Sequence, residues 1–184
     1  MNKAKPVGNS KTTITELMIP SYANFGGKIH GGILLSLMDK VAYACASKHA
    51  GTYCVTVSVD TVDFLQPVEV GELVSMKASV NYVGNTSLVV GIKVVAENVK
   101  TGIVKHTNTS YLTLVAKDEM DKPVRVPKLI LKTQDEVRRF VEAIRRKTLK
   151  QEIKREMGKA KSAFTIDLVM SHLENERCLI QLKA

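Results

Sequence analysis

The stretch His30-Gly-Gly-Ile-Leu-Leu-Ser-Leu-Met-Asp-Lys-Val-Ala-Tyr-Ala-Cys-Ala46 decides the fold. Its apolar residues cover nearly every face of a helix, which predicts a buried helix from about Gly31 to His49, with Gly51 just past its end. Asp39 lies in the middle of this run, where an ionised carboxylate is costly unless it is paired or solvated. We therefore expect Asp39 to lie where the core opens onto a cleft, which is typical of a catalytic carboxylate.

Alternating apolar and polar residues predict one strand before this helix and four strands after it. The expected strands cover residues 11–19, 54–65, 73–83, 87–97 and 103–115. Most of the turns between them are short, so the sheet should be largely antiparallel. No other element is available to cover the helix, so the sheet must wrap around it. The sequence thus predicts an α+β domain over residues 11–127, in which a curved antiparallel sheet surrounds a long central helix.

A basic C-terminal extension is expected over residues 128–184. Thr133-Gln-Asp-Glu136 is a capping-box pattern, and apolar residues at roughly helical spacing follow it as far as Gly158, where the helix should end. Residues 128–161 carry 12 basic and 5 acidic side chains, a net of +7 out of +9 for the whole chain. The segments 163–170 and 177–182 fit a small hairpin or further helix, and residues 1–10 are expected to be frayed.

Composition limits the possible environments and partners of the chain. Cys45, Cys54 and Cys178 form an odd set without CxxC spacing, which favours reduced thiols and a cytoplasmic protein. We expect no signal peptide and no membrane span, because no apolar run approaches about 18 residues. The basic segment lacks interleaved aromatic residues, so nucleic-acid binding is not expected. We expect neither a metal ion nor a cofactor.

Several groups near the helix could together perform acyl hydrolysis. Asn24 offers an amide in the preceding loop, and Thr56 offers a hydroxyl on the following strand. Gly31 and Gly32 allow a substrate to approach the backbone, and the free N–H groups of a helix start suit a developing oxyanion. The competing interpretations are a turn residue for Asn24, a strand former for Thr56 and a packed carboxylate for Asp39.

Residues 12 to about 127 resemble the hotdog-fold acyl-CoA thioesterases, specifically the broad-specificity acyl-CoA hydrolase subgroup. The matching stretches are Ala23-Asn-Phe-Gly-Gly-Lys-Ile-His-Gly-Gly32, Leu37-Met-Asp-Lys40, Val55-Thr-Val-Ser-Val-Asp-Thr-Val-Asp-Phe64, Pro67-Val-Glu-Val-Gly71, Gly84-Asn-Thr-Ser87 and Pro123 to Pro127. The resemblance implies dimers, commonly assembled into hexamers as trimers of dimers, with active sites at the subunit interface.

The resemblance also implies roles for individual residues. Asp39 takes the position of the catalytic carboxylate, as general base or nucleophile, and Thr56 takes that of the hydroxyl that helps to hold the water. Asn24 takes the position of an active-site amide supplied by the partner subunit. Gly32 is similar to the oxyanion donor, through its backbone N–H. His30 departs from the subgroup, much of which carries an aromatic residue at this position. The difference affects the shape expected for the acyl pocket.

The expected substrate contacts are Gly31 and the turn formed by Gly84, Asn85, Thr86 and Ser87, which resembles a turn near the coenzyme A moiety. Arg125 is a candidate phosphate contact by its charge. The resemblance implies hydrolysis of acyl-CoA thioesters to a carboxylic acid and coenzyme A, which is part of the substrate. A non-catalytic hotdog protein that senses acyl-CoA or a nucleotide is the alternative.

The basic helix has several interpretations at this stage. It could pack its apolar residues on the core or on another subunit, or it could expose a solvated charged face. It could also lie on an anionic membrane or attract nucleotides. Its charge could help to collect anionic CoA esters.

Overall fold

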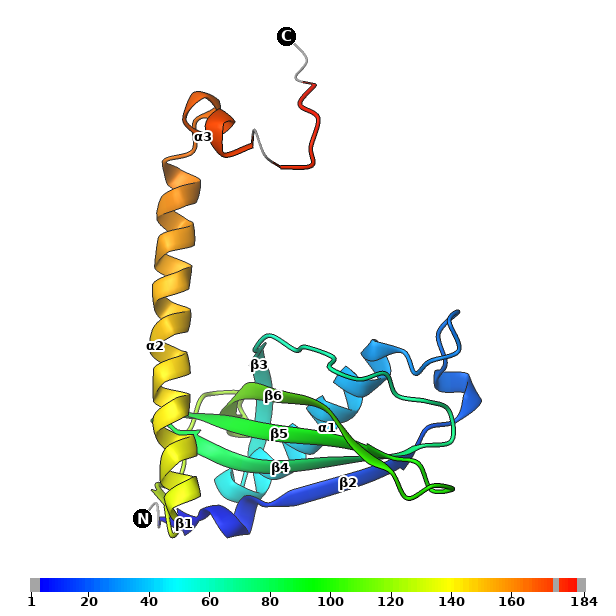
Figure 1. The fold of residues 1–184 in the computed structure, drawn as a ribbon. Helices are drawn as coiled ribbons and strands as arrows, with labels where there is room; N and C mark the ends of the chain where they lie inside the picture. The colour runs from blue at the N-terminus through cyan, green and yellow to red at the C-terminus, as the bar shows by residue number, and fades with distance from the viewer. Residues whose placement is uncertain (1–3, 174–175, 182–184) are drawn as a thin grey trace. The chain divides into compact units, whose positions relative to one another are not determined.

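The computed structural model describes residues 4–173 and 176–181. A five-stranded antiparallel sheet in the order β2-β4-β5-β6-β3 lies against one long helix, α1 (Gly31–Ala50) (Figure 1). The strands are β2 (Thr12–Leu17), β3 (Tyr53–Val59), β4 (Leu73–Val83), β5 (Ser87–Glu97) and β6 (Val104–Lys117). The predicted α+β class, with a curved antiparallel sheet around a long helix, is confirmed.

The sheet covers α1 on one side only. The buried positions of α1 recur every three or four residues, and they are Leu34, Leu37, Met38, Val41, Ala42, Cys45, Ala46 and His49. They pack against the alternating buried residues of β4, β5 and β6, such as Met76, Val90 and Leu114. Each large apolar side chain buried in this way contributes about 1.5–3 kcal/mol. The opposite side of α1 is exposed, including Leu35 and Tyr43. The expectation that α1 is buried on every face was therefore wrong for this chain.

Both ends of α1 are capped, by neighbouring residues and by one distant lysine. At its start, the backbone N–H of Gly32 donates to Nδ1 of His30 at 2.9 Å. At its end, Gly51 adopts a left-handed conformation with φ of 77° and donates to the carbonyl of Ser47, as expected for a C-terminal glycine. The ammonium of Lys5 donates to the carbonyl of His49 at 2.7 Å and so satisfies a further carbonyl in the last turn.

Residues 4–10 are tied to the domain, so the prediction of a frayed segment was wrong for them. Lys5 and Pro6 form β1 (Lys5–Pro6), which pairs in parallel with β7 (Leu129–Ile130), and a 3-10 turn, η1 (Val7–Ser10), follows. The Ser10 hydroxyl is buried, donates to the carbonyl of Val7 and accepts from the N–H of Val80. Val80 and the residues of β7 lie far away in the sequence, which is why local polarity did not reveal these contacts.

The strand expected over residues 54–65 ends earlier, at Val59. A register shift between Thr56 and Ser58 disturbs its ladder with β6, and bulges of this kind bend a strand. Residues 60–65 keep separate backbone hydrogen bonds to β6, from Asp60 to Tyr111 and from Leu65 to Thr107. This path brings the Phe64 ring over the start of α1, where it would lie 3.3 Å from a Cβ at Gly31.

The helix predicted after Thr133 is α2 (Gln134–Ser162), and the capping box is present. Glu136 donates its N–H to the Thr133 hydroxyl, and its carboxylate accepts from the N–H of Thr133. The predicted end at Gly158 was wrong, because Gly158 does not adopt positive φ and α2 continues through it. Glycine inside a helix costs only about 0.5–1 kcal/mol, too little by itself to end this one.

The chain divides into two compact units, Met1–Ala143 and Ile144–Ala184. The second unit contains the remainder of α2 and a short helix, α3 (Ile166–Leu173). Of the two interpretations left open for residues 163–170, helix is therefore observed from residue 166 onward, and residues 163–165 lie outside it. Residues 177–181 form neither helix nor strand, and residue 182 lies outside the described residues. The domain boundary expected after residue 127 stays a prediction. Among the helices that the structure describes, none has the length and apolarity needed to cross a bilayer.

The cap at His30 leads to a prediction about stability. Replacing His30 with Ala removes the acceptor for the Gly32 N–H, so we expect a loss of about 0.5–2 kcal/mol in the free energy of unfolding. His30→Asn retains a short side-chain acceptor and should lose less. Urea unfolding of the two variants and the wild type measures the difference, and equal stability of all three would show that the cap does not contribute.

His49 predicts a pH dependence of stability. Burial lowers the pKa of the His49 imidazole below 6.5. This effect outweighs the hydrogen bond to the Pro127 carbonyl, which raises the pKa. The charge of Lys5 lowers the pKa further. The unfolded chain therefore binds the proton more readily. The stability that follows is fully present above pH 6.5 and is lost as the pH falls toward the lower pKa of the folded state.

We expect His49→Gln to flatten the decline of unfolding free energy as the pH falls below 6.5, by at most about 1.4 kcal/mol per pH unit. Urea denaturation at several pH values checks this. Parallel curves for wild type and variant would mean that His49 is not the group responsible.

Candidate active site

Asp39 on α1 and Thr56 on β3 are brought together by the packing of the helix on the sheet. The Thr56 hydroxyl donates to Oδ1 of Asp39 at 2.6 Å. Thr56 has the same strand parity as buried Cys54, which turns its side chain toward α1. Among the described residues, the second carboxylate oxygen of Asp39 has no hydrogen-bond or ion-pair partner. The carboxylate is thus oriented by one hydrogen bond and keeps one oxygen open to solvent or substrate.

Asp39 lies on the exposed side of α1, so the expectation of a carboxylate among buried apolar neighbours was wrong for the single chain. Asp39 lies four residues after Leu35 and four residues before Tyr43, so the three side chains share one side of the helix. Leu35 and Tyr43 are 39% and 44% exposed. The burial of Asp39 therefore depends on what covers this side of the helix, and none of the residues that the structure describes covers Asp39.

Large exposed apolar side chains lie on α1 and β3, the two elements that carry the Asp39–Thr56 pair. We call their surface the α1/β3 face and define it by Leu35, Tyr43, Tyr53, Val57 and Val59, all of them exposed. The rings of Tyr43 and Tyr53 lie 6.0 Å apart and connect the helix side of the face to its strand side. β3 is also an edge strand of the sheet. An apolar face beside a free strand edge is typical of an interaction surface.

The start of α1 differs from the expectation for Gly32. Because its N–H donates to the His30 ring, the expected oxyanion donor already has an acceptor. Among the described residues, the N–H of Gly31 has no acceptor. The Phe64 ring lies so close to Gly31 that a side chain there would have to displace it. The free N–H of the helix start thus belongs to Gly31.

Asn24 forms a turn within its own loop. Its carboxamide oxygen accepts from the N–H groups of Gly26 and Lys28, at 2.9 and 3.2 Å. In the described part of this chain, no hydrogen bond joins Asn24 to Asp39 or Thr56. The turn interpretation therefore accounts for the oxygen of Asn24, whereas its amide nitrogen remains available.

The four residues Gly84, Asn85, Thr86 and Ser87 form the turn between β4 and β5, as predicted. The N–H of Gly84 donates to the carbonyl of Ser87 at 2.8 Å. The carbonyl of Asn85 accepts from the N–H of Val126, which brings the turn next to exposed Arg125 in the connector, the segment between β6 and β7. These expected coenzyme A contacts are thus close to one another, and no hydrogen bond joins them to Asp39 within the described chain.

Two features were missed at the level of sequence. The cap from His30 was missed because histidine is not among the residues preferred at helix starts. A basic hollow between the sheet and the first turns of α2 was missed because its residues come from four separate elements.

Burial raises the pKa of the Cys45 thiol to about 12, and all three cysteines are free, as predicted. Across the described residues, no three His, Cys, Asp or Glu side chains are grouped to hold a metal ion.

The chain is similar to known proteins over most of its length. Residues 26–103 match the thioesterase superfamily. The protein VdlD of Helicobacter pylori is 47% identical over 141 residues, which cover 77% of this chain and 80% of that protein.

The chain is also similar in structure to solved acyl-CoA thioesterases and hydrolases. A hexameric acyl-CoA thioesterase without ligand is 36% identical, with a TM-score of 0.80 over 83% of this chain and 97% of that one. The acyl-CoA hydrolase of Staphylococcus aureus, solved with butyryl coenzyme A, coenzyme A and coenzyme A disulfide, is 30% identical, with a TM-score of 0.78 over 86% and 97%. Variants of that hydrolase with alanine in place of an aspartate, a threonine or an asparagine have also been solved.

Three findings agree. The sheet wraps one long helix, nearly half of the aligned residues are identical to those of a protein of similar length, and solved structures match the fold. The chain belongs to the thioesterase superfamily and has the hotdog fold.

Proposed function

We propose that this protein hydrolyses acyl-CoA thioesters to a carboxylic acid and coenzyme A, with Asp39 as the reacting carboxylate. The observation that carries the proposal is the 2.6 Å hydrogen bond that holds Asp39 against Thr56 and leaves one carboxylate oxygen open. The relatives named as acyl-CoA thioesterase and acyl-CoA hydrolase support the choice of substrate class.

As a general base, Asp39 takes a proton from water while the water oxygen attacks the thioester carbonyl carbon. The resulting tetrahedral intermediate collapses, the carbon–sulfur bond breaks and the coenzyme A thiolate recovers a proton. As a nucleophile, Asp39 attacks the same carbon and expels the thiolate, and water then hydrolyses the mixed anhydride. In both routes Thr56 fixes the orientation of the carboxylate, and its hydroxyl oxygen can still accept from the water.

The spacing of residues supports the same assignment. In the Staphylococcus aureus hydrolase, the replaced asparagine, aspartate and threonine are separated by 15 and 17 residues. Asn24, Asp39 and Thr56 have the same two separations in this chain. Three residue types at matched spacing are a far more specific agreement than any one of them.

The oxyanion of the intermediate needs a donor near the start of α1. The free N–H of Gly31 suits this role directly. Gly32 can serve as well when the His30 ring turns away from its N–H. The turn of residues 84–87 and Arg125 would contact the coenzyme A moiety.

A second copy of the chain would complete the site. Covering the α1/β3 face with a partner would remove its exposed apolar side chains from water, pair the free edge of β3 and desolvate Asp39. The loop of Asn24 would then supply its free amide nitrogen to the partner's Asp39. The hexameric relative supports further assembly into a trimer of dimers.

The role of Asp39 predicts a large loss of activity in Asp39→Asn. Removing the base should lower kcat by a factor of about 10²–10⁴ without unfolding the protein, because Asp39 is exposed in the chain and asparagine keeps its shape. Thiol release from short, medium and long acyl-CoAs measures the rates. Glu97→Gln, the same acid-to-amide change at an exposed strand end, is the matched control.

An Asp39→Asn variant that turns over at the wild-type rate would remove Asp39 from the mechanism. A wild-type protein that binds acyl-CoA without releasing thiol would favour the sensor alternative.

The shared site predicts complementation between two inactive variants. Mixed dimers of Asn24→Ala and Asp39→Asn subunits contain one intact site, so random reassortment should restore about a quarter of the wild-type activity. The variants are unfolded and refolded together, and thiol release is measured. The control replaces Asn24→Ala with the double variant Asn24→Ala/Asp39→Asn, which cannot form an intact site. Equal activity in both mixtures would mean that Asn24 and Asp39 act within one subunit.

A further inference from the structure

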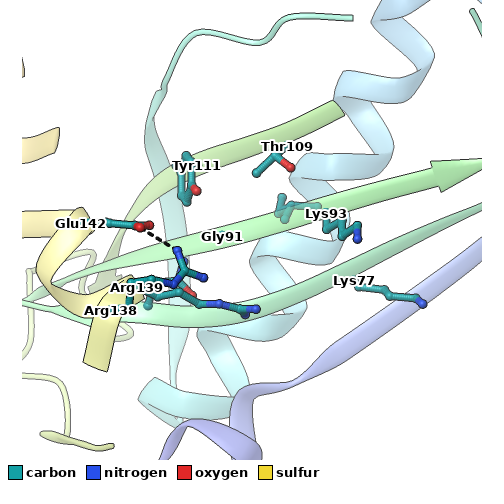
Figure 2. Close-up of a pocket in the computed structure, with 10 residues that line it drawn as sticks. Lys77, Gly91, Lys93, Thr109, Tyr111, Arg138, Arg139 and Glu142 are labelled. Carbon is teal, nitrogen blue, oxygen red and sulfur yellow. Dashed lines mark hydrogen bonds and ion pairs between the residues drawn. The ribbon is translucent and has the colours of Figure 1, made fainter. Parts of the chain in front are cut away.

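A hollow of about 180 Å³ lies on the outer face of the sheet, beside the first turns of α2. Figure 2 shows Lys77 on β4, Lys93 on β5, and Arg138 and Arg139 on α2 around it. All of these residues belong to the unit Met1–Ala143. The hollow lies across the sheet from α1 and therefore takes no part in the Asp39–Thr56 pair.

Lys77 and Lys93 are exposed and lie directly opposite each other on neighbouring strands. Like charges at opposed positions of a sheet are destabilising. In the described part of the chain, neither lysine has an acidic partner, whereas Lys28, Lys105 and Lys117 are paired with carboxylates. The sheet thus carries two opposed lysines whose charges no ion pair neutralises in the described part of the chain.

The two arginines are oriented before any ligand arrives. Arg139 is paired with Asp135 at 2.7 Å, and Arg138 is paired with Glu142 at 2.6 Å and with Asp135. These pairs fix the guanidinium groups, which lowers the entropy cost of binding. Four cations against two carboxylates leave a net charge of +2 around the hollow, which matches a dianion.

The floor of the hollow carries a neutral donor. The Asn81 oxygen accepts from the Ser79 hydroxyl at 3.1 Å, so its amide nitrogen faces Gly91. That nitrogen would lie 2.2 Å from a Cβ at Gly91, so a side chain there would displace it. The missing side chain thus leaves room for an N–H donor among the cations, a combination that suits the oxygens of a phosphate group.

We propose that this hollow binds the phosphate group of a ligand through Lys77, Lys93, Arg139 and Asn81. Its volume is below the roughly 300–1,000 Å³ of a site that encloses a whole organic ligand. It therefore accommodates a phosphate or diphosphate and leaves the rest of the ligand outside. Two sources share this chemistry: the phosphates of coenzyme A and a free phosphate compound. The proposal does not depend on the chemistry at Asp39.

Calorimetric titration of the full chain with inorganic pyrophosphate, in phosphate-free buffer at low ionic strength, tests the proposal. The wild type should show saturable binding, and Lys77→Gln/Lys93→Gln should raise Kd at least tenfold. Lys100→Gln/Lys122→Gln removes the same charge at two exposed lysines elsewhere and should leave Kd unchanged. Gly91→Ala should also weaken binding, because it displaces Asn81. Absent saturable binding, or one Kd shared by the wild type and both lysine variants, would overturn the proposal.

Competition then distinguishes the two sources. If coenzyme A supplies the phosphate, coenzyme A displaces pyrophosphate, pantetheine does not, and Lys77→Gln/Lys93→Gln raises KM for acyl-CoA while kcat stays the same. If the source is a free phosphate compound, coenzyme A does not displace pyrophosphate and KM is unchanged. Both results support a phosphate site. Pyrophosphate binding is measured without turnover, so an inactive Asp39→Asn protein should still bind pyrophosphate.

Discussion

The one-sided cover of α1 by the sheet is the constraint on which the rest of the structure depends. The buried positions of α1 follow a three-and-four spacing that fits the concave face of the sheet. Its other side stays apolar at Leu35 and Tyr43 although it faces solvent in the chain. The second copy proposed above would cover this exposed side, and Asp39 lies on it. The location of the carboxylate and the apolar face follow from the same packing.

The C-terminal end of α1 is held by distant parts of the chain. Lys5 reaches the carbonyl of His49, and the His49 ring contacts the carbonyl of Pro127, so the N-terminal segment and the connector meet at the end of the helix. Ser10 ties η1 to β4 through the N–H of Val80. These bonds close the domain around the C-terminal end of α1.

The two faces of the sheet carry different chemistry. The inner face is apolar and presents Thr56 to α1, whereas the outer face carries Lys77 and Lys93 beside the first turns of α2. The Phe140 ring contacts Tyr82 at 5.1 Å between centroids, which holds this part of α2 against the sheet. The alternation of side chains along a strand allows one sheet to support both the proposed hydrolytic site and the separate proposed anion site.

Local patterns in the sequence determined α1, its glycine stop at Gly51, β4, β5 and the capping box of α2, because spacing and capping depend on neighbouring residues alone. They also singled out Asp39 and Thr56. Only the tertiary structure decided that Thr56 donates to Asp39 and that residues 4–10 join the domain. The physical reason is that these contacts join residues far apart in the sequence, and the three-dimensional packing of their segments sets which of them meet.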